Sequence, residues 1–474
     1  MVTRRWVGLL LVLALVLSAC PRDEAGQTAT SATTTPTATT TTLGTSTTAR
    51  PTTTVDSGEL EPIPEAPQAE CFYLDGYLVV EEGQGDAAIA AMSGFDVDLE
   101  VVSAGEVLGE GTAESETLDA ALDVLSSNVD PFDVATALQS AQVVAGPVYA
   151  IGLASHWKFG PGTDPISRPG VTIPDPTSDL GDGIIAVVDS GFVVDPQLPD
   201  WMSPEHVLYD PNLDTETIGT DPGVASHGTF VTSVIRQLAP EFRVAFASAQ
   251  PRAPVTIVEN DDTLPPDVQF VSTELHVAEA IVRLTNRPAL GRGGVAALNL
   301  SLGTYACDPG EDPTMITTMA AMRTWFGAFP DSTIFAAGGN DPYEAPFWPA
   351  GLSTFPLDGT IDPDRVRGVG AVNEAAQQVV WAQVAGATAT VAPRRPGLRV
   401  WVTDTAPGCD LLGLRGGVDD DGATVVAWSG SSFAAAVSTA VSATIPPSSV
   451  GPSTDIDFSI PGLSFERLGS CNIP

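Results

Sequence analysis

Residues 184–191 read Ile184-Ile-Ala-Val-Val-Asp189-Ser-Gly191, an unbroken apolar run that ends in an aspartate and a turn. A strand that is apolar at every position is typical of a parallel sheet buried on both faces. In sheets of this kind, ligands bind where the strands end at their carboxyl edge. Asp189 is therefore expected at such an edge, although an aspartate that caps a turn explains it better when it is considered alone.

Apolar runs of the same kind recur along the chain and alternate with helical patterns. The further expected strands are Val244–Ser248, Val295–Asn299, Thr333–Ala337 and Val366–Val372. The expected helices are Thr229–Leu238, Ser272–Thr285 and Pro313–Phe329. Strands that alternate with helices predict an α/β fold, in which helices cover both faces of a parallel sheet.

A histidine and a serine stand near the start of two helical patterns. His227 opens His227-Gly-Thr229, ahead of apolar residues at helical spacing, and Ser432 lies in Gly430-Ser-Ser-Phe-Ala434. Considered singly, the histidine is more often structural and the serine more often a helix cap. Together they predict nucleophilic catalysis, because a serine hydroxyl is a weak nucleophile and a nearby histidine supplies the base that it needs.

The three segments and their order resemble the catalytic blocks of the subtilisin family of serine peptidases. Residues 189–191, 227–229 and 430–434 stand where that family has Asp-[Thr/Ser]-Gly, His-Gly-Thr and Gly-Thr-Ser-Met-Ala. Ala297-Leu-Asn-Leu-Ser-Leu-Gly303 is similar to the family's substrate-lining strand, and Phe335-Ala-Ala-Gly-Gly-Asn340 is similar to the segment that ends in its oxyanion asparagine. These blocks are spread in order over residues 183–440.

The resemblance implies a subtilisin-like parallel sheet sandwiched by helices, and a role for each matched residue. Asp189, His227 and Ser432 would form the catalytic triad, Asn340 would stabilise the oxyanion, and Ser301, Leu302 and Gly303 would bind substrate. The expected reaction is the hydrolysis of peptide bonds through an acyl-enzyme on Ser432. That chemistry requires no cofactor and no metal.

Two matched positions depart from the family pattern. Phe230 replaces a histidine that often follows His-Gly-Thr, and Ala436 replaces a proline that often follows the serine block. Neither position takes part in the chemistry. Acidic clusters at 259–262 and 419–421 are candidates for structural calcium, because calcium prefers oxygen ligands, with solvated turns as the alternative.

The N-terminus predicts export. Residues 1–20 form a lipoprotein-type signal peptide, in which an apolar run too short to span a bilayer ends in Leu17-Ser-Ala-Cys20, similar to the bacterial lipobox whose cysteine is acylated. An ordinary signal peptide with an incidental cysteine is the alternative.

Residues 21–65 predict an extended Thr/Pro-rich tether, with 16 threonines between positions 27 and 55. The protein is therefore expected outside the cytoplasm, at a bacterial cell surface, either anchored through lipid on Cys20 or released.

Residues 66–153 predict a small α+β unit of ferredoxin-like order, which resembles the inhibitory propeptide of the same family. Its expected strands are 72–80, 97–102, 106–110 and 142–151, and its expected helices are 87–92, 118–127 and 134–140. A linker follows at 154–182, and the peptidase domain covers 183–474. Because the last strand of the unit would deliver the linker to the substrate site, we expect a zymogen that cleaves itself between about Gly160 and Asp182.

The composition limits the partners and the compartment. A net charge of −39, from 59 acidic and 20 basic residues, opposes binding to nucleic acid. Of the 5 cysteines, Cys20 is assigned to lipid, and the others allow two disulfides, which suits a chain outside the reducing cytosol. The four remaining cysteines can pair in three ways, which the sequence leaves open. The expected partners are a protein or peptide substrate and a membrane reached only through the lipid, and the chain is expected to be a monomer.

The sequence thus predicts a secreted serine endopeptidase. The competing hypothesis is a non-catalytic surface lipoprotein, a binding or receptor module on a subtilisin-like scaffold. Reactivity of Ser432 toward a fluorophosphonate distinguishes the two.

Overall fold

The computed structural model describes residues 72–109, 113–152, 165–176, 179–216, 226–252, 255–259, 262–263, 271–291, 294–305, 315–340, 345–355, 357, 359–372, 379–380, 390–391, 402–416, 424–444 and 461–464. The predicted signal peptide, Cys20 and the predicted tether lie outside these residues. The predicted domain boundaries stay predictions.

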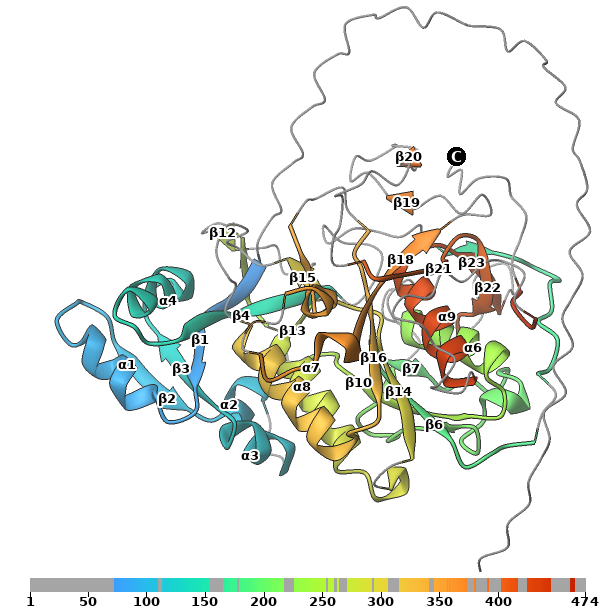
Figure 1. Cartoon of the computed structure of the whole chain (residues 1–474), viewed down its shortest axis with the longest axis horizontal. Coiled ribbons are helices and arrows are strands. Elements are labelled where there is room, and N and C mark those ends of the chain that lie inside the picture. The colour runs from blue at the N-terminus through green and yellow to red at the C-terminus, as the bar shows by residue number, and fades with distance from the viewer. Residues whose placement is uncertain are drawn as a thin grey trace, which may run out of the picture. The chain divides into compact units, whose positions relative to one another are not determined.

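A seven-stranded parallel sheet forms the centre of the C-terminal part (Figure 1). Its strand order is β21-β18-β16-β14-β6-β10-β8, and each neighbouring pair runs parallel. The strands are β6 (Ile184–Asp189), β8 (Val207–Leu208), β10 (Arg243–Ser248), β14 (Val295–Leu300), β16 (Thr333–Ala337), β18 (Val366–Val372) and β21 (Asp404–Pro407). All the strands expected from apolar runs are present, and β8 and β21 extend the sheet at its edges.

The central strand β6 shows why its sequence is apolar at every position. Ile184, Ala186 and Val188 join one hydrophobic cluster, whereas Ile185 and Val187 join another. All of these side chains are buried. Successive side chains of a strand point to opposite faces, so an apolar run requires cover on both. The predicted α/β class, a parallel sheet sandwiched by helices, is confirmed.

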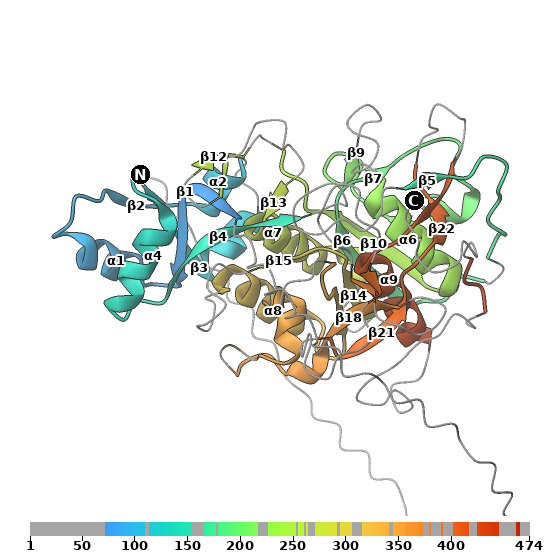
Figure 2. The same ribbon diagram turned by 90° about the horizontal axis from the view of Figure 1, so that it is seen from above.

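The principal helices of the described residues cover the sheet in pairs, with α7 against α8 and α6 against α9 (Figure 2). They are α6 (His227–Leu238), α7 (Glu274–Thr285), α8 (Ile316–Ala328) and α9 (Ser431–Thr444). The α7 and α8 side chains join the cluster of Ile184, and those of α6 and α9 join the cluster of Ile185. Alanines at 434–436 let α9 pack closely against β14, β16 and β18.

An antiparallel sheet of order β4-β1-β3-β2 forms the N-terminal part (Figure 1). Its strands are β1 (Phe72–Glu81), β2 (Leu99–Val102), β3 (Leu122–Ser127) and β4 (Ala145–Gly152). Its helices are α1 (Gly85–Met92), α2 (Ala104–Leu108), α3 (Ala113–Asp119) and α4 (Pro131–Ser140). Met92 of α1 and Leu138 of α4 share a cluster on one face of the sheet. This is a ferredoxin-like arrangement, as the sequence predicts, with two short helices inserted before β3.

The strand expected at 106–110 is wrong, because helix α2 occupies most of this segment. The Ser103 side chain accepts a hydrogen bond from Glu106 N at 3.1 Å and caps the helix at its N-terminus. Gly109 ends the helix with φ 78°, in the left-handed region that favours glycine. Ser103 followed by Glu106 is the capping-box pattern, a local signal of this helix.

The helix expected at 118–127 is wrong in its second half, which forms strand β3. Leu118, Leu122 and Leu125 recur at helical spacing, and all three are buried. In the structure, β3 is a central strand that pairs with β1 on one side and β2 on the other. The strand is therefore decided by long-range pairing and not by local periodicity.

The N-terminal and C-terminal parts share a hydrophobic cluster and backbone pairing. Phe72 and Tyr149 lie in the same cluster as Leu275 of α7 and Met319 of α8. Strand β13 (Val271–Thr273) pairs with β4, and β11 (Ile257–Glu259) pairs with β1. The N-terminal sheet is thus continued by strands from the C-terminal part.

The other described elements are short, and few of them bear on function. The short strands are β5 (Ile166–Ser167), β7 (Phe192–Val193), β9 (Thr215–Glu216), β12 (Asp262–Thr263), β15 (Thr304–Tyr305), β17 (Phe347–Trp348), β19 (Val379–Val380), β20 (Thr390–Val391), β22 (Leu411–Leu414) and β23 (Val425–Trp428). The 3₁₀ turns are η1 (Asp200–Met202), η2 (Pro288–Leu290), η3 (Ala350–Ser353) and η4 (Pro363–Arg365). Within the described ranges, every helix is too short or too polar to span a bilayer.

Cys409 is buried and disulfide-bonded. The other cysteines lie outside the described residues, so the pairing that the sequence leaves open stays open.

Candidate active site

Asp189 is the last residue of β6 and lies at the carboxyl edge of the parallel sheet. Its side chain is fully buried, and Oδ1 accepts a hydrogen bond from Ser190 N at 2.8 Å. Oδ2 has no hydrogen-bond partner among the described residues. Buried polar atoms without a partner are uncommon in folded proteins, and a catalytic role is one reason to retain one.

His227 is the first residue of α6, and its imidazole faces Asp189. Its Nδ1 lies 2.6 Å from Asp189 Oδ1, and both side chains are buried. Because a carboxylate only accepts hydrogen bonds, this contact places a proton on Nδ1 and leaves Nε2 of the neutral ring as the basic atom. The close approach requires glycine at position 228, where a Cβ would lie 2.7 Å from Gly191 O and 2.8 Å from Phe246 Cζ.

Two aromatic rings flank the imidazole. The ring centre of His227 lies 5.4 Å from that of Trp428 and 5.3 Å from that of Phe433. Phe230 packs edge to face on the same two rings, at 5.4 Å and 4.6 Å. These contacts restrict the orientation of the imidazole, and they explain how a phenylalanine is accommodated at position 230.

Ser432 lies in the first turn of α9, against the residue that follows β14. Ser432 Oγ donates to Ser301 O at 3.0 Å, and Ser301 Oγ donates to Ser432 O at 2.6 Å. The described contacts of Ser432 Oγ do not include His227. Catalytic hydrogen bonds are often long or misaligned in the absence of substrate, so this geometry leaves Ser432 a candidate nucleophile.

Asn340 follows β16 and contacts the start of α9. Its Oδ1 accepts a hydrogen bond from Ser431 N at 2.8 Å, and its side chain is buried. This contact fixes which way the amide is turned, with the NH₂ group on the opposite side as the donor. The preceding Gly339 has φ +85°, a backbone conformation that favours glycine and turns the chain toward α9.

The segment Ser301-Leu302-Gly303 lies beside the end of β4. Gly152 N donates to Gly303 O at 3.1 Å, in an antiparallel bridge. On its other edge β4 pairs with β13, where residues 150–152 face residues 273–271. The end of β4 therefore lies between β13 and the segment Ser301–Gly303, as an added peptide strand does. The sequence indicated the Ser301 side of this groove but missed β13, which is hidden at the start of the expected helix 272–285.

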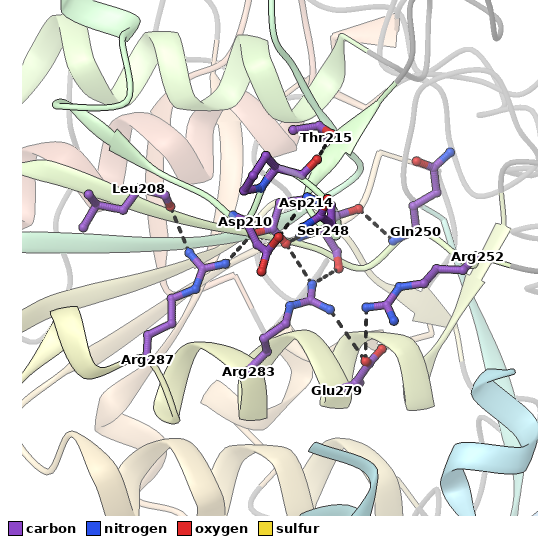
Figure 3. Close-up of polar contacts among 12 residues, drawn as sticks. Leu208, Asp210, Asp214, Thr215, Ser248, Gln250, Arg252, Glu279, Arg283 and Arg287 are labelled. Carbon is purple, nitrogen blue, oxygen red and sulfur yellow. Dashed lines mark hydrogen bonds and ion pairs between the residues drawn. The ribbon is translucent and has the colours of Figure 1, made fainter. Parts of the chain in front are cut away.

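A second buried aspartate, Asp214, organises a charged cluster next to the strand of Asp189 (Figure 3). Its Oδ1 accepts hydrogen bonds from Arg283 and from Ser248 N, each at 3.0 Å, and Arg287 contacts its Oδ2. Ser248 ends β10 and is the register partner of Asp189. The cluster therefore holds the strand end beside Asp189. The sequence gives no local signal of it, because its members come from separate segments.

Burial shifts the pKa values of two groups near the start of α7. Burial raises the pKa of Glu274 to about 7, against the opposing effect of hydrogen bonds from Thr318 and Tyr149. Tyr149 N donates to Glu274 Oε2 at 3.3 Å, so this carboxyl group joins β4 to α7. Burial, assisted by the charge of Arg252, lowers the pKa of His276 to about 3, which keeps that imidazole neutral at physiological pH.

Other candidate residues are not among those described. Cys20 and the acidic cluster at 419–421 lie outside the described residues, as do the side chains of the cluster at 259–262. Calcium binding therefore stays a prediction. A cavity of about 470 Å³ between the C-terminal ends of α7 and α8 lies at the opposite end of α7 from β13, and it is not part of the candidate active site.

No protein-family model matches the chain, and no curated protein matches it. Similar solved structures include fervidolysin from Fervidobacterium pennivorans, a keratinolytic enzyme related to subtilisin, at 17% identity over 81% of this chain and 55% of that chain, with a TM-score of 0.41. The MycP3 protease of the type VII (ESX-3) secretion system is 18% identical over 59% of this chain and 79% of that chain, with a TM-score of 0.33. The prenylagaramide maturation protease PagA is 21% identical over 55% of this chain and 74% of that chain, with a TM-score of 0.33. Similarities of this size do not establish a shared activity.

The class of fold is defined by the topology itself. It is a subtilisin-like α/β fold, with helices on both faces of a seven-stranded parallel sheet and an antiparallel N-terminal sheet packed against α7 and α8.

Proposed function

We propose that this chain is a serine endopeptidase, which hydrolyses peptide bonds through an acyl-enzyme on Ser432. The observation that carries the proposal is the buried 2.6 Å contact between Asp189 and His227. Ser432 and Asn340 lie at the same edge of the sheet, with Ser432 in the first turn of α9 and Asn340 bonded to Ser431 N in that turn. A buried base, a hydroxyl and an amide donor are the groups that acyl transfer to serine requires.

In the proposed mechanism, His227 Nε2 takes the proton of Ser432 Oγ as that oxygen attacks the substrate carbonyl. Before this transfer, Ser432 Oγ exchanges its hydrogen bond with Ser301 O for one with the imidazole. Asp189 stabilises the imidazolium, and the Asn340 amide and the Ser432 N–H stabilise the oxyanion. The imidazolium returns its proton to the leaving amine, and a water molecule activated by His227 hydrolyses the acyl-enzyme.

Labelling with a fluorophosphonate probe tests this proposal. Wild-type protein should be labelled and Ser432→Ala should not. Ser438→Ala is a matched control, because Ser438 lies in the same helix, is buried, and has an Oγ without a hydrogen-bond partner among the described residues. Equal labelling of wild type and Ser432→Ala, or no labelling of either, would favour the non-catalytic binding module.

Replacing Asn340 tests the oxyanion donor. Asn340→Asp keeps an oxygen that can accept from Ser431 N but removes the amide donor, so turnover should fall by about 10²–10³. The rate of peptide hydrolysis measures this. An unchanged rate would remove Asn340 from the mechanism.

We also propose that the N-terminal part acts as a propeptide that keeps the precursor inactive. The support is the position of β4, whose end pairs with β13 on one edge and with Gly303 on the other. A substrate cannot pair with these strands while β4 remains there. Wild-type precursor should therefore convert to two fragments, with activity rising as it does so, whereas Ser432→Ala should remain one chain.

Anchoring at an extracytoplasmic surface through lipid on Cys20 is a proposal that rests on the sequence alone. The expected result is that a fatty-acid analogue labels wild type but not Cys20→Ser, and that this variant leaves the membrane fraction. Membrane retention of an unlabelled Cys20→Ser protein would contradict it. A monomeric state, an absence of nucleic-acid partners and two disulfides remain expectations of the same kind.

A further inference from the structure

An aromatic side chain fills the space between the two glycine-containing segments beside Ser432. A Cβ on Gly303 would lie 2.3 Å from Phe347 Cε1 and 2.7 Å from its Cζ. A Cβ on Gly339 would lie 3.0 Å from Phe347 Cγ and 2.8 Å from the Tyr305 hydroxyl. The tip of the Phe347 ring thus touches one segment and its base touches the other.

This ring is held in place by its neighbours. Phe347 is 5% exposed, and in the two-stranded antiparallel sheet of β15 and β17 it pairs directly with Tyr305. The two rings lie 4.9 Å apart, and Tyr305 is 1% exposed. Cross-strand aromatic pairs of this kind stabilise an antiparallel strand pair, so a ligand would have to displace both rings to gain space here.

The pairing of β4 shows how an extended substrate would approach the ring. Gly152 faces Gly303 in an antiparallel bridge, so the residue two positions further along a docked strand faces Ser301. Ser301 O accepts the hydrogen bond of Ser432 Oγ, so this substrate residue is the one whose carbonyl lies nearest the nucleophile. It is the residue immediately before the scissile bond, which is called P1.

The P1 side chain points to the side of the strand on which Phe347 packs. Side chains two residues apart share a face, and residues that face each other across strands do so as well. P1 therefore projects to the same side as a side chain at position 303 would, and on that side the Phe347 ring extends from Gly303 to Gly339, the residue before Asn340.

We propose that Phe347 determines the specificity of the candidate active site, by limiting P1 to glycine, alanine or serine. The inference rests on the proposed peptidase function. The chain's own sequence agrees with it, because the residue two positions after Gly152 is Ala154, followed by Ser155. Neither residue is among those described, and processing after Ala154 falls earlier than the range 160–182 expected from the linker composition.

The test uses enzyme that is produced as the full-length chain and has then processed itself. The substrates are quenched fluorescent peptides that differ only at P1, with alanine, leucine or phenylalanine. Wild type should cleave the alanine peptide at least about 100-fold faster, in kcat/KM, than the other two, because several carbons must be excluded. Phe347→Ala should raise the leucine-to-alanine ratio by about 10–100-fold. Phe347→Leu, which keeps an apolar side chain against Tyr305, should raise this ratio by a smaller factor.

Phe329→Leu is the matched control, since Phe329 is also buried but follows α8 and should leave the ratio unchanged. N-terminal sequencing of the processed wild type should begin at Ser155. Efficient wild-type cleavage after leucine or phenylalanine would overturn the inference, as would ratios that Phe347→Ala and Phe347→Leu leave unchanged. Absence of any cleavage together with absence of probe labelling would instead overturn the proposed function, and this inference with it.

Discussion

Asp189 and Asp214 are two fully buried aspartates near the same edge of the sheet, and their surroundings differ. Asp214 accepts hydrogen bonds on both oxygens, including 3.0 Å contacts from Arg283 and Ser248 N. Asp189 has contacts from His227 and Ser190 N on Oδ1 only, and its Oδ2 lacks a partner among the described residues. A carboxylate already saturated by arginines stabilises structure, whereas one paired with a histidine can stabilise a positive charge that forms on that ring during a reaction.

The largest effect that this comparison predicts is on activity. Asp189→Asn should lower kcat/KM by about 10⁴-fold, because an amide no longer holds His227 in the tautomer with a basic Nε2. The free energy of unfolding should change little, since Oδ2 is already unpaired among the described residues. Peptide hydrolysis and urea unfolding measure the two quantities. A loss of activity below 10-fold would show that the two aspartates do not differ in function.

The second effect is on stability. Asp214→Asn should lower the free energy of unfolding by about 3–5 kcal/mol, because it removes the counter-charge of the half-buried Arg287 and one of the two carboxylates that contact the buried Arg283. The rate of peptide hydrolysis, divided by the amount of protein that the fluorophosphonate probe labels, should match that of wild type. Asp210→Asn is the matched control, since Asp210 is only half-buried and should cost far less. Equal destabilisation by the two variants would contradict the structural role of Asp214.

A third buried carboxyl group, that of Glu274, extends the comparison, because its titration makes the free energy of unfolding depend on pH. Its pKa is raised from 4.5 to about 7 by burial, so its contribution to stability is present below pH 4.5 and is lost as the pH rises through 7. The loss is on the order of 3 kcal/mol. His276, whose pKa is lowered to about 3, acts in the opposite direction below its usual pKa of 6.5, so a comparison of variants is required.

Glu274→Gln isolates the effect, because it keeps an oxygen that can accept from Tyr149 N and does not titrate. The difference in unfolding free energy between wild type and this variant should change between pH 5 and pH 8 in favour of the variant. Urea unfolding at both pH values measures it. A difference that does not depend on pH would place the Glu274 titration outside this range.

The parts of the fold that the sequence predicts well are those in which local pattern and tertiary environment agree. The apolar runs at 333–337 and 366–372 coincide with β16 and β18, because strands buried on both faces must be apolar throughout. Motif spacing likewise indicated the positions of Asp189 and His227 at a strand end and a helix start. Segment 118–127 failed, because its leucines fit a helix as well as a strand and only pairing with β1 and β2 separates them.

By itself, the sequence determined the class of fold and which residue types could carry acid–base chemistry, since both follow from periodicity and from the order of short motifs. The tertiary structure decided what those residues contact. It brought Asp189 within hydrogen-bond distance of His227, placed Asp214 between two arginines, and set Phe347 between Gly303 and Gly339. The physical reason is that such contacts join segments far apart in the chain, where register and packing, rather than local propensity, select the neighbours.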